Sequence, residues 1–226
     1  MSRGVKRYIS ITMEQPDPLA VRRTGRPLSF DRETALAVAM RLFWQHGFEA
    51  TSTAELTRAM GITPPSLYAA FGDKRRLFRE AVDRYLGGVE SVIGAIEGAA
   101  TAYLAGRDLL IAAAVGGTGE DTPAGCLLAS SIVSCSTGAA EVREELAALR
   151  RGIEAALRSR IERDIAAGIL PAGCDAEALA GHVFAVVQGM STLAKDGAGR
   201  DKLLRIAAGA MAAWPGASSP TARPEG

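Results

Sequence analysis

Residues 63–72, TPPSLYAAFG, could form a short helix that binds a groove of double-stranded DNA. At 100° per residue, Leu67 and Phe71 share one side of that helix and would face the core. The opposite side carries small side chains and one phenol: Pro65, Ser66, Tyr68 and Ala69. Such a face lets a helix lie close to the groove floor, with the phenol donating to a phosphate. A solvated helix with Tyr68 half-packed against its neighbours is the alternative.

Two sets of cations flank this segment and could bind phosphates. Lys74 falls in the first turn of the next expected helix, where its ammonium and the free backbone N–H groups can bind one phosphate together. The alternative is an ordinary surface lysine. Arg22, Arg23 and Arg26 end the polar, aperiodic segment 1–28. This basic arm is placed to enter a flanking minor groove, where guanidinium groups favour narrow A·T-rich stretches.

The sequence lacks the residue patterns that catalysis or metal binding requires. Glu144 and Glu145 are adjacent rather than facing, and the GGTG run at 116–119 lacks a flanking strand and lysine. The three cysteines have none of the paired spacings of zinc sites, and the two histidines stand far apart. We therefore expect neither an enzyme nor a metal site, and no cofactor.

Length, composition and charge indicate one or two small folded domains. The chain has 226 residues, of which 48% are hydrophobic, and this excludes disordered and collagen-like classes. Residues 1–80 carry 13 basic and 8 acidic side chains, whereas residues 81–226 carry 13 and 17. A polyanion-binding domain joined to a separate second domain would produce this asymmetry.

No membrane or export segment is expected. The charge-free stretch 122–140 contains a proline, two glycines and several hydroxyl side chains, which disfavour a membrane span. Residues 1–20 have no apolar stretch or cleavage site of a secretory signal. We therefore expect a cytoplasmic protein without membrane partners.

End signals place the first two helices. Asp31 is expected to cap a helix that Gly47 ends. Ser52 and Glu55 form a capping box at the start of a second helix, which ends at Gly61.

Two further helices follow at once. Thr63 and Pro64 start the third helix, where the missing N–H of proline costs nothing, and Gly72 ends it. Asp73 would then cap a long fourth helix. Since no alternating strand pattern is found, the whole core is expected to be helical.

Two short helices around a glycine-centred turn, with a longer helix before them, form a helix-turn-helix. Residues 25–85 closely resemble the N-terminal DNA-binding domain of the TetR/AcrR transcriptional regulators. The matching residues are Ala39, Leu42, Phe43, Gly47, Phe48, Thr51, Thr53, Met60, Gly61, Ser66, Leu67, Tyr68, Phe71 and Lys74.

This resemblance implies an all-α protein and a function. An N-terminal helix-turn-helix domain (29–75) would follow the arm (1–28), and a helical ligand-binding and dimerisation domain (76–214) would precede a disordered tail (215–226). The protein would be a homodimeric repressor that a small-molecule effector releases from a palindromic DNA operator. The resemblance also implies that Thr53 and Lys74 contact phosphates. The predicted DNA-binding residues are Arg26, Thr53, Thr63, Pro64, Pro65, Ser66, Tyr68 and Lys74.

The second domain is expected to be a helical bundle rich in Ala, Gly and Leu. Its helices are predicted at 101–115, 126–136, 140–167, 176–195 and 201–214. The 140–167 segment is expected to expose a charged, solvated face that includes Glu144, Glu145, Arg150, Arg151, Arg158, Arg160 and Arg163.

Two helices could form a dimer interface. Small residues recur at three and four positions in the 176–195 segment, which permits close helix approach; this small-residue seam is Ala178, Gly181, Ala185 and Gly189. The last helix adds a broad apolar face with Leu204, Ala208 and Met211. The resemblance implies a four-helix interface made by two such pairs, and the alternative is packing within one chain.

Residues for an effector pocket follow only from the resemblance, which places the pocket among the bundle helices. The polar and aromatic candidates are Tyr103, Ser130, Ser134, His182, Phe184 and Gln188. Each of them could instead serve packing alone.

Two other functions stay open. A thiol-sensing regulator could use Cys126 or Cys135, but on one continuous helix these residues face opposite sides and cannot form a bridge. Neither cysteine has a basic neighbour within three residues to lower its pKa. A helical interaction module that has lost DNA binding is the third possibility.

Overall fold

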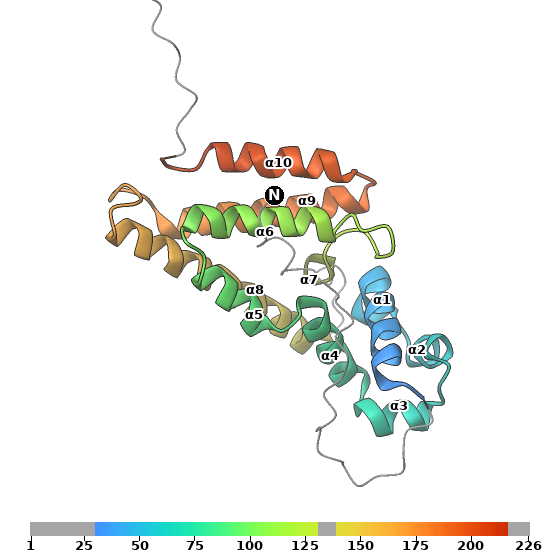
Figure 1. Ribbon diagram of the computed structural model, residues 1–226. Coiled ribbons are helices and arrows are strands. Elements are labelled where there is room, and N and C mark those ends of the chain that lie inside the picture. The colour runs from blue at the N-terminus through green and yellow to red at the C-terminus, as the bar shows by residue number, and fades with distance from the viewer. Residues whose placement is uncertain (1–29, 131–138, 217–226) are drawn as a thin grey trace, which may run out of the picture.

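The computed structural model describes residues 30–130 and 139–216, and within these ranges every regular element is a helix (Figure 1). One end of the molecule, which we call the head, consists of α1 (Arg32–Ala50), α2 (Thr53–Met60), α3 (Pro64–Phe71) and α4 (Lys74–Leu86). The remainder, the body, consists of α5 (Val89–Glu97), α6 (Ala102–Gly116), α7 (Leu127–Ser130), α8 (Ala140–Ala166), α9 (Ala176–Lys195) and α10 (Arg200–Ala212). The predicted all-α class is confirmed.

The head helices begin at the predicted caps. The Asp31 carboxylate accepts from the Glu33 N–H at 3.0 Å. The capping box of α2 is complete, because the Glu55 N–H donates to the Ser52 hydroxyl at 3.1 Å and the Ser52 N–H donates to the Glu55 carboxylate at 2.7 Å. Gly47 breaks the helical path of α1 at a φ of +80°, a conformation that favours glycine.

Aromatic rings form much of the head core. Phe43 on α1 meets Phe78 on α4 edge to face at 5.0 Å between ring centroids, and Phe48 lies 5.1 Å from the same ring. Trp44 packs edge to face on Tyr85 at 4.8 Å. These contacts join α1 to α4 and leave α2 and α3 to pack against the pair.

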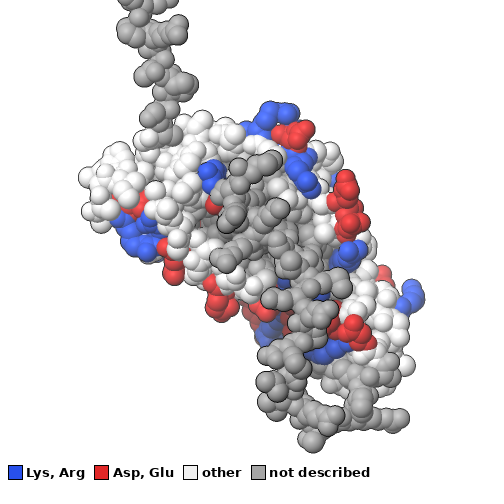
Figure 2. Space-filling model, viewed as in Figure 1, with Lys and Arg blue, Asp and Glu red and all other residues white. Residues whose placement is uncertain are grey.

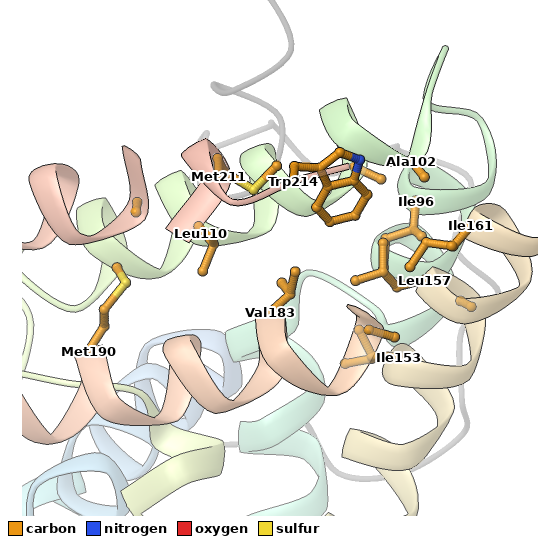
Figure 3. Packing of buried hydrophobic residues seen from close by; sticks show 14 of the residues in the cluster. Ile96, Ala102, Leu110, Ile153, Leu157, Ile161, Val183, Met190, Met211 and Trp214 are labelled. Atoms are coloured by element: carbon orange, nitrogen blue, oxygen red, sulfur yellow. The ribbon is translucent and has the colours of Figure 1, made fainter. Parts of the chain in front are cut away.

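The body is layered, with α10 outermost in Figure 1. Helix α10 packs on α6 and α9. Helix α9 also packs on α8, and α8 packs on α5. Trp214, just after α10, is 4% exposed and closes the body core. Figure 3 shows its ring between Met211 and Ala102 at the top of the buried cluster.

Helix α5 was not predicted. Its N-cap is Gly88, which provides no side-chain cap, and Gly94 lies inside the helix, so local sequence signals for a helix are weak. Ile96 is fully buried in the body core, and this packing stabilises α5. The helix expected at 126–136 begins as α7, and residues 131–138 lie outside the described ranges.

The prediction that Arg160 lies on a solvated face of α8 was wrong. Arg160 is 8% exposed, and its guanidinium donates to the carbonyls of Ala99 and Ala100 at 3.1 and 2.7 Å. It also pairs at 2.6 Å with Asp164, whose carboxylate accepts from the Ala102 N–H. This buried pair caps the start of α6, where a carboxylate complements the exposed N–H groups.

On the face drawn in Figure 2, basic and acidic side chains are interspersed over the described surface, in keeping with a net charge of +1. Among residues 30–130 and 139–216, no helix is long and apolar enough to cross a membrane.

Candidate nucleic-acid interface

Helix α3 has an inward and an outward side, as its spacing predicts. Leu67 and Phe71 are 0% and 2% exposed and pack in the head core. Tyr68 is 52% exposed, one of the large apolar side chains that stand free of the core. The other outward residues are small: Pro64, Pro65 and Ala69 are exposed, and Ser66 is half-buried.

The start of α3 holds two hydroxyl groups close together. The Thr63 hydroxyl caps the helix by accepting from the Ser66 N–H at 3.4 Å, and it lies 2.9 Å from the Ser66 hydroxyl. Both side chains belong to the predicted DNA-binding set. Their exposed hydroxyl groups can donate to a phosphate or to a base edge in a groove.

Lys74 lies against the last turn of α1, which follows the kink at Gly47. Its ammonium donates to the Glu49 carbonyl at 3.4 Å and stands 4.4 Å from the centre of the Phe48 ring. Partial burial lowers the pKa of Lys74, and the carboxylates of Glu49 and Glu55 oppose that shift. Since Glu55 is in the first turn of α2, Lys74 faces the same helix start as the half-buried Thr53.

Arg32 is a residue of this site that the sequence reasoning missed. It is the first residue of α1, but its guanidinium donates to the Ala70 carbonyl at the end of α3 and pairs with Glu80 on α4. A cation at a helix start, next to the N-cap Asp31, is electrostatically unfavourable for that helix. The unfavourable position of the Arg32 charge is the sequence signal that could have indicated a hydrogen-bond or ion-pair partner outside α1.

Ion pairs join the head to the body. Arg75 and Arg79 on α4 both bind the Glu145 carboxylate on α8, with the Arg79 Nε at 2.8 Å, and Arg75 also pairs with Glu141. The hydrogen bonds from Arg79 and then Arg75 lower the pKa of Glu145 to about 2. Helix α4 follows α3 directly, so these pairs connect the α3 end of the head to the long helix of the body.

A second junction lies at the loop before α7. The Trp44 Nε1–H on α1 donates to the Gly125 carbonyl at 3.0 Å, while the Cys126 N–H donates to the Ser191 hydroxyl on α9 at 2.8 Å. Burial and the neighbouring Cys126 raise the pKa of Tyr85. The fold therefore places Cys126 between the head and the body, with partners that the sequence spacing did not reveal.

The predicted effector residues do not form one site in the described residues. Phe184 and Gln188 line a surface groove of about 280 Å³ between α8 and α9, together with Arg150, Arg151 and Glu154. Tyr103 instead packs edge to face on Trp214, and His182 is exposed. The Ser130 side chain and Ser134 lie outside the description.

Helix α9 presents the small residues of the predicted dimer face, and α8 packs beside it. In the seam, Ala178, Ala185 and Gly189 are exposed and Gly181 is half-buried. Helix α8 adds an exposed row that the sequence reasoning missed: Ala148, Gly152, Ala155 and Ser159. On α10, Ala208 is exposed and Leu204 half-buried, but Met211 is 4% exposed because α10 turns its apolar side onto α6 and α9.

Arg26 and the arm lie outside the described residues, as does Cys135. Within the described ranges, no group of three or more His, Cys, Asp or Glu side chains could hold a metal ion.

Family models match both parts of the chain. Residues 35–81 match the model of bacterial regulatory proteins of the tetR family, and residues 107–208 match the tetracyclin repressor-like C-terminal domain.

Two of the named relatives match most of the chain, and a third matches a shorter part of it. The HTH-type transcriptional repressor ComR of Escherichia coli is 38% identical over 195 residues, which cover 84% of this chain and 92% of ComR. The HTH-type transcriptional repressor BdcR of the same species is 52% identical over 63 residues, 28% of this chain and 32% of BdcR. A cysteine-substituted variant of the TetR family regulator CifR, solved with 26-bp operator DNA, superposes with a TM-score of 0.78 at 41% identity and covers 84% of this chain and 100% of that one.

Proposed function

Because the chain belongs to the TetR family of bacterial regulatory proteins and is a DNA-binding transcriptional regulator, we propose that it is a homodimeric cytoplasmic repressor. A small-molecule effector would release it from a palindromic operator. The observation that carries this proposal is the outward face of α3, where small side chains surround the exposed Tyr68. The names of ComR and BdcR support repression, and the operator complex of CifR supports binding through the head.

The phosphate contacts are assigned to the helix starts around α3. Lys74 faces the start of α2, where Thr53 and the free N–H groups can bind a phosphate. At the start of α3, the Thr63 hydroxyl can donate to another phosphate of the DNA backbone. These contacts fix the position of α3 but carry no sequence information.

Base readout by α3 is limited. Pro64, Pro65 and Ala69 cannot form a bidentate hydrogen bond with a base edge, and bidentate pairs contribute about 1–3 kcal/mol of discrimination each. Ser66 and Tyr68 remain for hydrogen bonding, and Pro65 can contact thymine methyl groups. We assign the remaining discrimination to the arm with Arg22, Arg23 and Arg26. Deletion of residues 1–26 should weaken binding to a selected operator more than binding to random DNA at fixed salt.

The dimer is assigned to α8 and α9. Both helices expose small residues side by side, so the helices of a second copy can approach closely and form a four-helix interface. A two-fold axis there would present two copies of α3 to successive major grooves, whose centres lie about 34–36 Å apart.

The effector would act by a population shift. The two heads can have a spacing that binds DNA or one that does not. A ligand that binds both spacings equally well does not change their populations. An effector that releases DNA must therefore bind the DNA-incompetent spacing more tightly. The ion pairs of Arg75 and Arg79 with Glu145 give a physical connection from α8 to α4, and α4 directly follows the DNA-facing helix.

Lys74→Ala tests the proposed interface. Binding should weaken alike for all DNA sequences, and the slope of log K against log salt should fall by about one, because one phosphate contact is lost. Lys202→Ala, which removes an exposed lysine of α10, is the matched control and should leave the slope unchanged. A loss confined to one operator sequence would mean that Lys74 reads bases and that the assignment is wrong.

Thiol sensing is the second candidate, and the position of Cys126 favours it. Cys126 lies at the junction of head and body, next to the half-buried Tyr85, and its N–H donates to the Ser191 hydroxyl on α9. Modification there would disturb contacts of α1, α4 and α9 together. Cys126→Ser should abolish any release from DNA caused by a thiol-specific reagent, and release that persists in this variant would exclude Cys126.

A further inference from the structure

The DNA-facing helix α3 has few anchors of its own. It has eight residues, of which only Leu67 and Phe71 are buried. Its last turn contains no basic side chain, so the carbonyls there must find other partners. The Gly72 N–H satisfies the Tyr68 carbonyl at 2.9 Å.

Arg32 provides the cation that this helix end lacks. Its Nε and Nη2 lie 3.4 and 3.3 Å from the Ala70 carbonyl oxygen, and its guanidinium carbon stands 4.5 Å from the centre of the Phe71 ring. A cation at the C-terminus of a helix is favoured by the helix dipole, and a planar guanidinium can donate and stack at the same time. One side chain of α1 therefore contacts two successive residues at the end of α3.

Glu80 on α4 holds the guanidinium in place. Its carboxylate accepts from the Arg32 Nη2 at 2.5 Å, and both side chains are half-buried. Arg32 thus connects α1, α3 and α4 at one point. A rotation of α3 about its own axis would have to break these contacts.

We propose that Arg32 is a positioning residue for DNA recognition, which sets the orientation of α3 in the groove without contacting DNA itself. This inference rests on the proposed contact of α3 with the major groove. A small change in helix orientation misaligns Ser66 and Tyr68 with the bases, whereas phosphate contacts by flexible cations tolerate it. Loss of Arg32 should therefore affect sequence-specific binding far more than nonspecific binding.

The chain offers a matched control. Arg84 on α4 pairs with Glu33 on α1 at 2.5 Å, so it also connects α1 to α4, but its recorded partner is not on α3. Arg84→Met removes an α1–α4 ion pair whose arginine is about as exposed as Arg32. A general loosening of the head would follow from either variant, while a change in α3 orientation would follow from Arg32→Met alone.

The test measures affinity for two duplexes at several salt concentrations. One duplex is selected by the wild-type full chain from a random library, and the other is a scrambled duplex of the same length and composition. Arg32→Met should lower affinity for the selected duplex tenfold or more, change affinity for the scrambled duplex less than twofold and leave the salt slope unchanged. Arg32→Lys keeps the cation but not the planar fork and should show a loss in the same direction, as should Glu80→Gln. Arg84→Met should leave the ratio of the two affinities at its wild-type value.

Three results would overturn the proposal. Equal losses of affinity for both duplexes would show that Arg32 contributes only to the general stability of the head. The same conclusion would follow if Arg32→Met and Arg84→Met had the same ratio of affinities for the two duplexes. A salt slope lower by about one, restored by Arg32→Lys, would make Arg32 a phosphate contact. If Arg32→Met does not fold by circular dichroism, the Arg32→Lys and Glu80→Gln ratios decide. Wild-type binding that does not distinguish the two duplexes would contradict the proposed function itself.

Discussion

The head and the body are packed by different kinds of residue. In the head, the rings of Phe43, Phe48 and Phe78 interlock, and Trp44 packs on Tyr85. In the body, the core consists mainly of aliphatic side chains and alanines, and one ring pair, between Tyr103 and Trp214, is found among the described residues. Large rings in defined edge-to-face contacts fix one arrangement of helices, whereas small residues allow helices to approach closely.

This difference corresponds to the two proposed roles. A unit that reads DNA must hold the outward face of α3 at a fixed angle, and ring packing together with Arg32 provides that rigidity. A unit that pairs with a second copy needs close helix contacts, and the small residues of α8 and α9 provide them. The ion pairs between α4 and α8 connect the two units.

Phe43→Ala should have the largest effect, because it removes a fully buried ring from the head core. We expect a loss of about 3–5 kcal/mol in the free energy of unfolding, measured by urea denaturation. DNA binding should fall with it, while the dimer persists in light scattering because the body has its own core. Simultaneous loss of the dimer would show that head and body are not separate in stability.

Ala185→Leu should prevent dimer formation by the body. Each protomer should stay folded, because Ala185 is exposed in the isolated protomer. The variant should be monomeric in light scattering. Its affinity for the selected operator should fall about a hundredfold, or about 2.8 kcal/mol, since a palindrome needs two joined heads. Gly181→Leu is a second test of the same face, because the added Cβ would lie 3.5 Å from the Glu154 carboxylate, an ordinary contact distance.

Ala212→Leu is the control for the dimer prediction. Ala212 is exposed on α10, which is not part of the proposed α8–α9 interface, and its substitution should leave the dimer intact. Stable dimers in both the Ala185 and Gly181 variants would move the interface elsewhere.

Glu145→Gln should have the smallest effect on the free energy of unfolding. It removes the carboxylate that pairs α8 of the body with α4 of the head. The exposed ion pairs are expected to stabilise by about 0.5–1 kcal/mol at neutral pH and less at high salt. Because folding lowers the pKa of Glu145 from 4.5 to about 2, this stability is present above pH 4.5 and is lost as the pH falls toward 2. The difference in unfolding free energy between wild type and Glu145→Gln should therefore shrink between pH 5 and pH 3. Glu162→Gln, from the exposed Arg158 pair, should show a smaller difference. A gap that does not change with pH would contradict this assignment.

Local signals explain why the head could be predicted closely. The caps Asp31, Ser52, Thr63 and Asp73 act within three residues of their own position, so the sequence contains both partners of each bond. The inward position of Leu67 and Phe71 follows from helical spacing alone.

Long-range partners explain what was missed. Arg32 meets Ala70 and Glu80, which are 38 and 48 residues away, and the buried Arg160 meets backbone carbonyls about 60 residues away. Helix α5 has no capping side chain and depends on the burial of Ile96. The apolar face of α10 was predicted to lie in a dimer interface, because its width can be read from the sequence. The sequence does not show that α10 packs on α6 in the same chain, where Met211 is buried.

Chemical footprinting of the wild-type chain on the duplex that it selects from a random library tests most directly whether paired heads read DNA through α3. The account predicts two protected patches in the major groove, with centres about 34–36 Å or one helical turn apart, and loss of both patches when Ser66 and Tyr68 are replaced by alanine. A single protected patch, or protection confined to the minor groove, would contradict it.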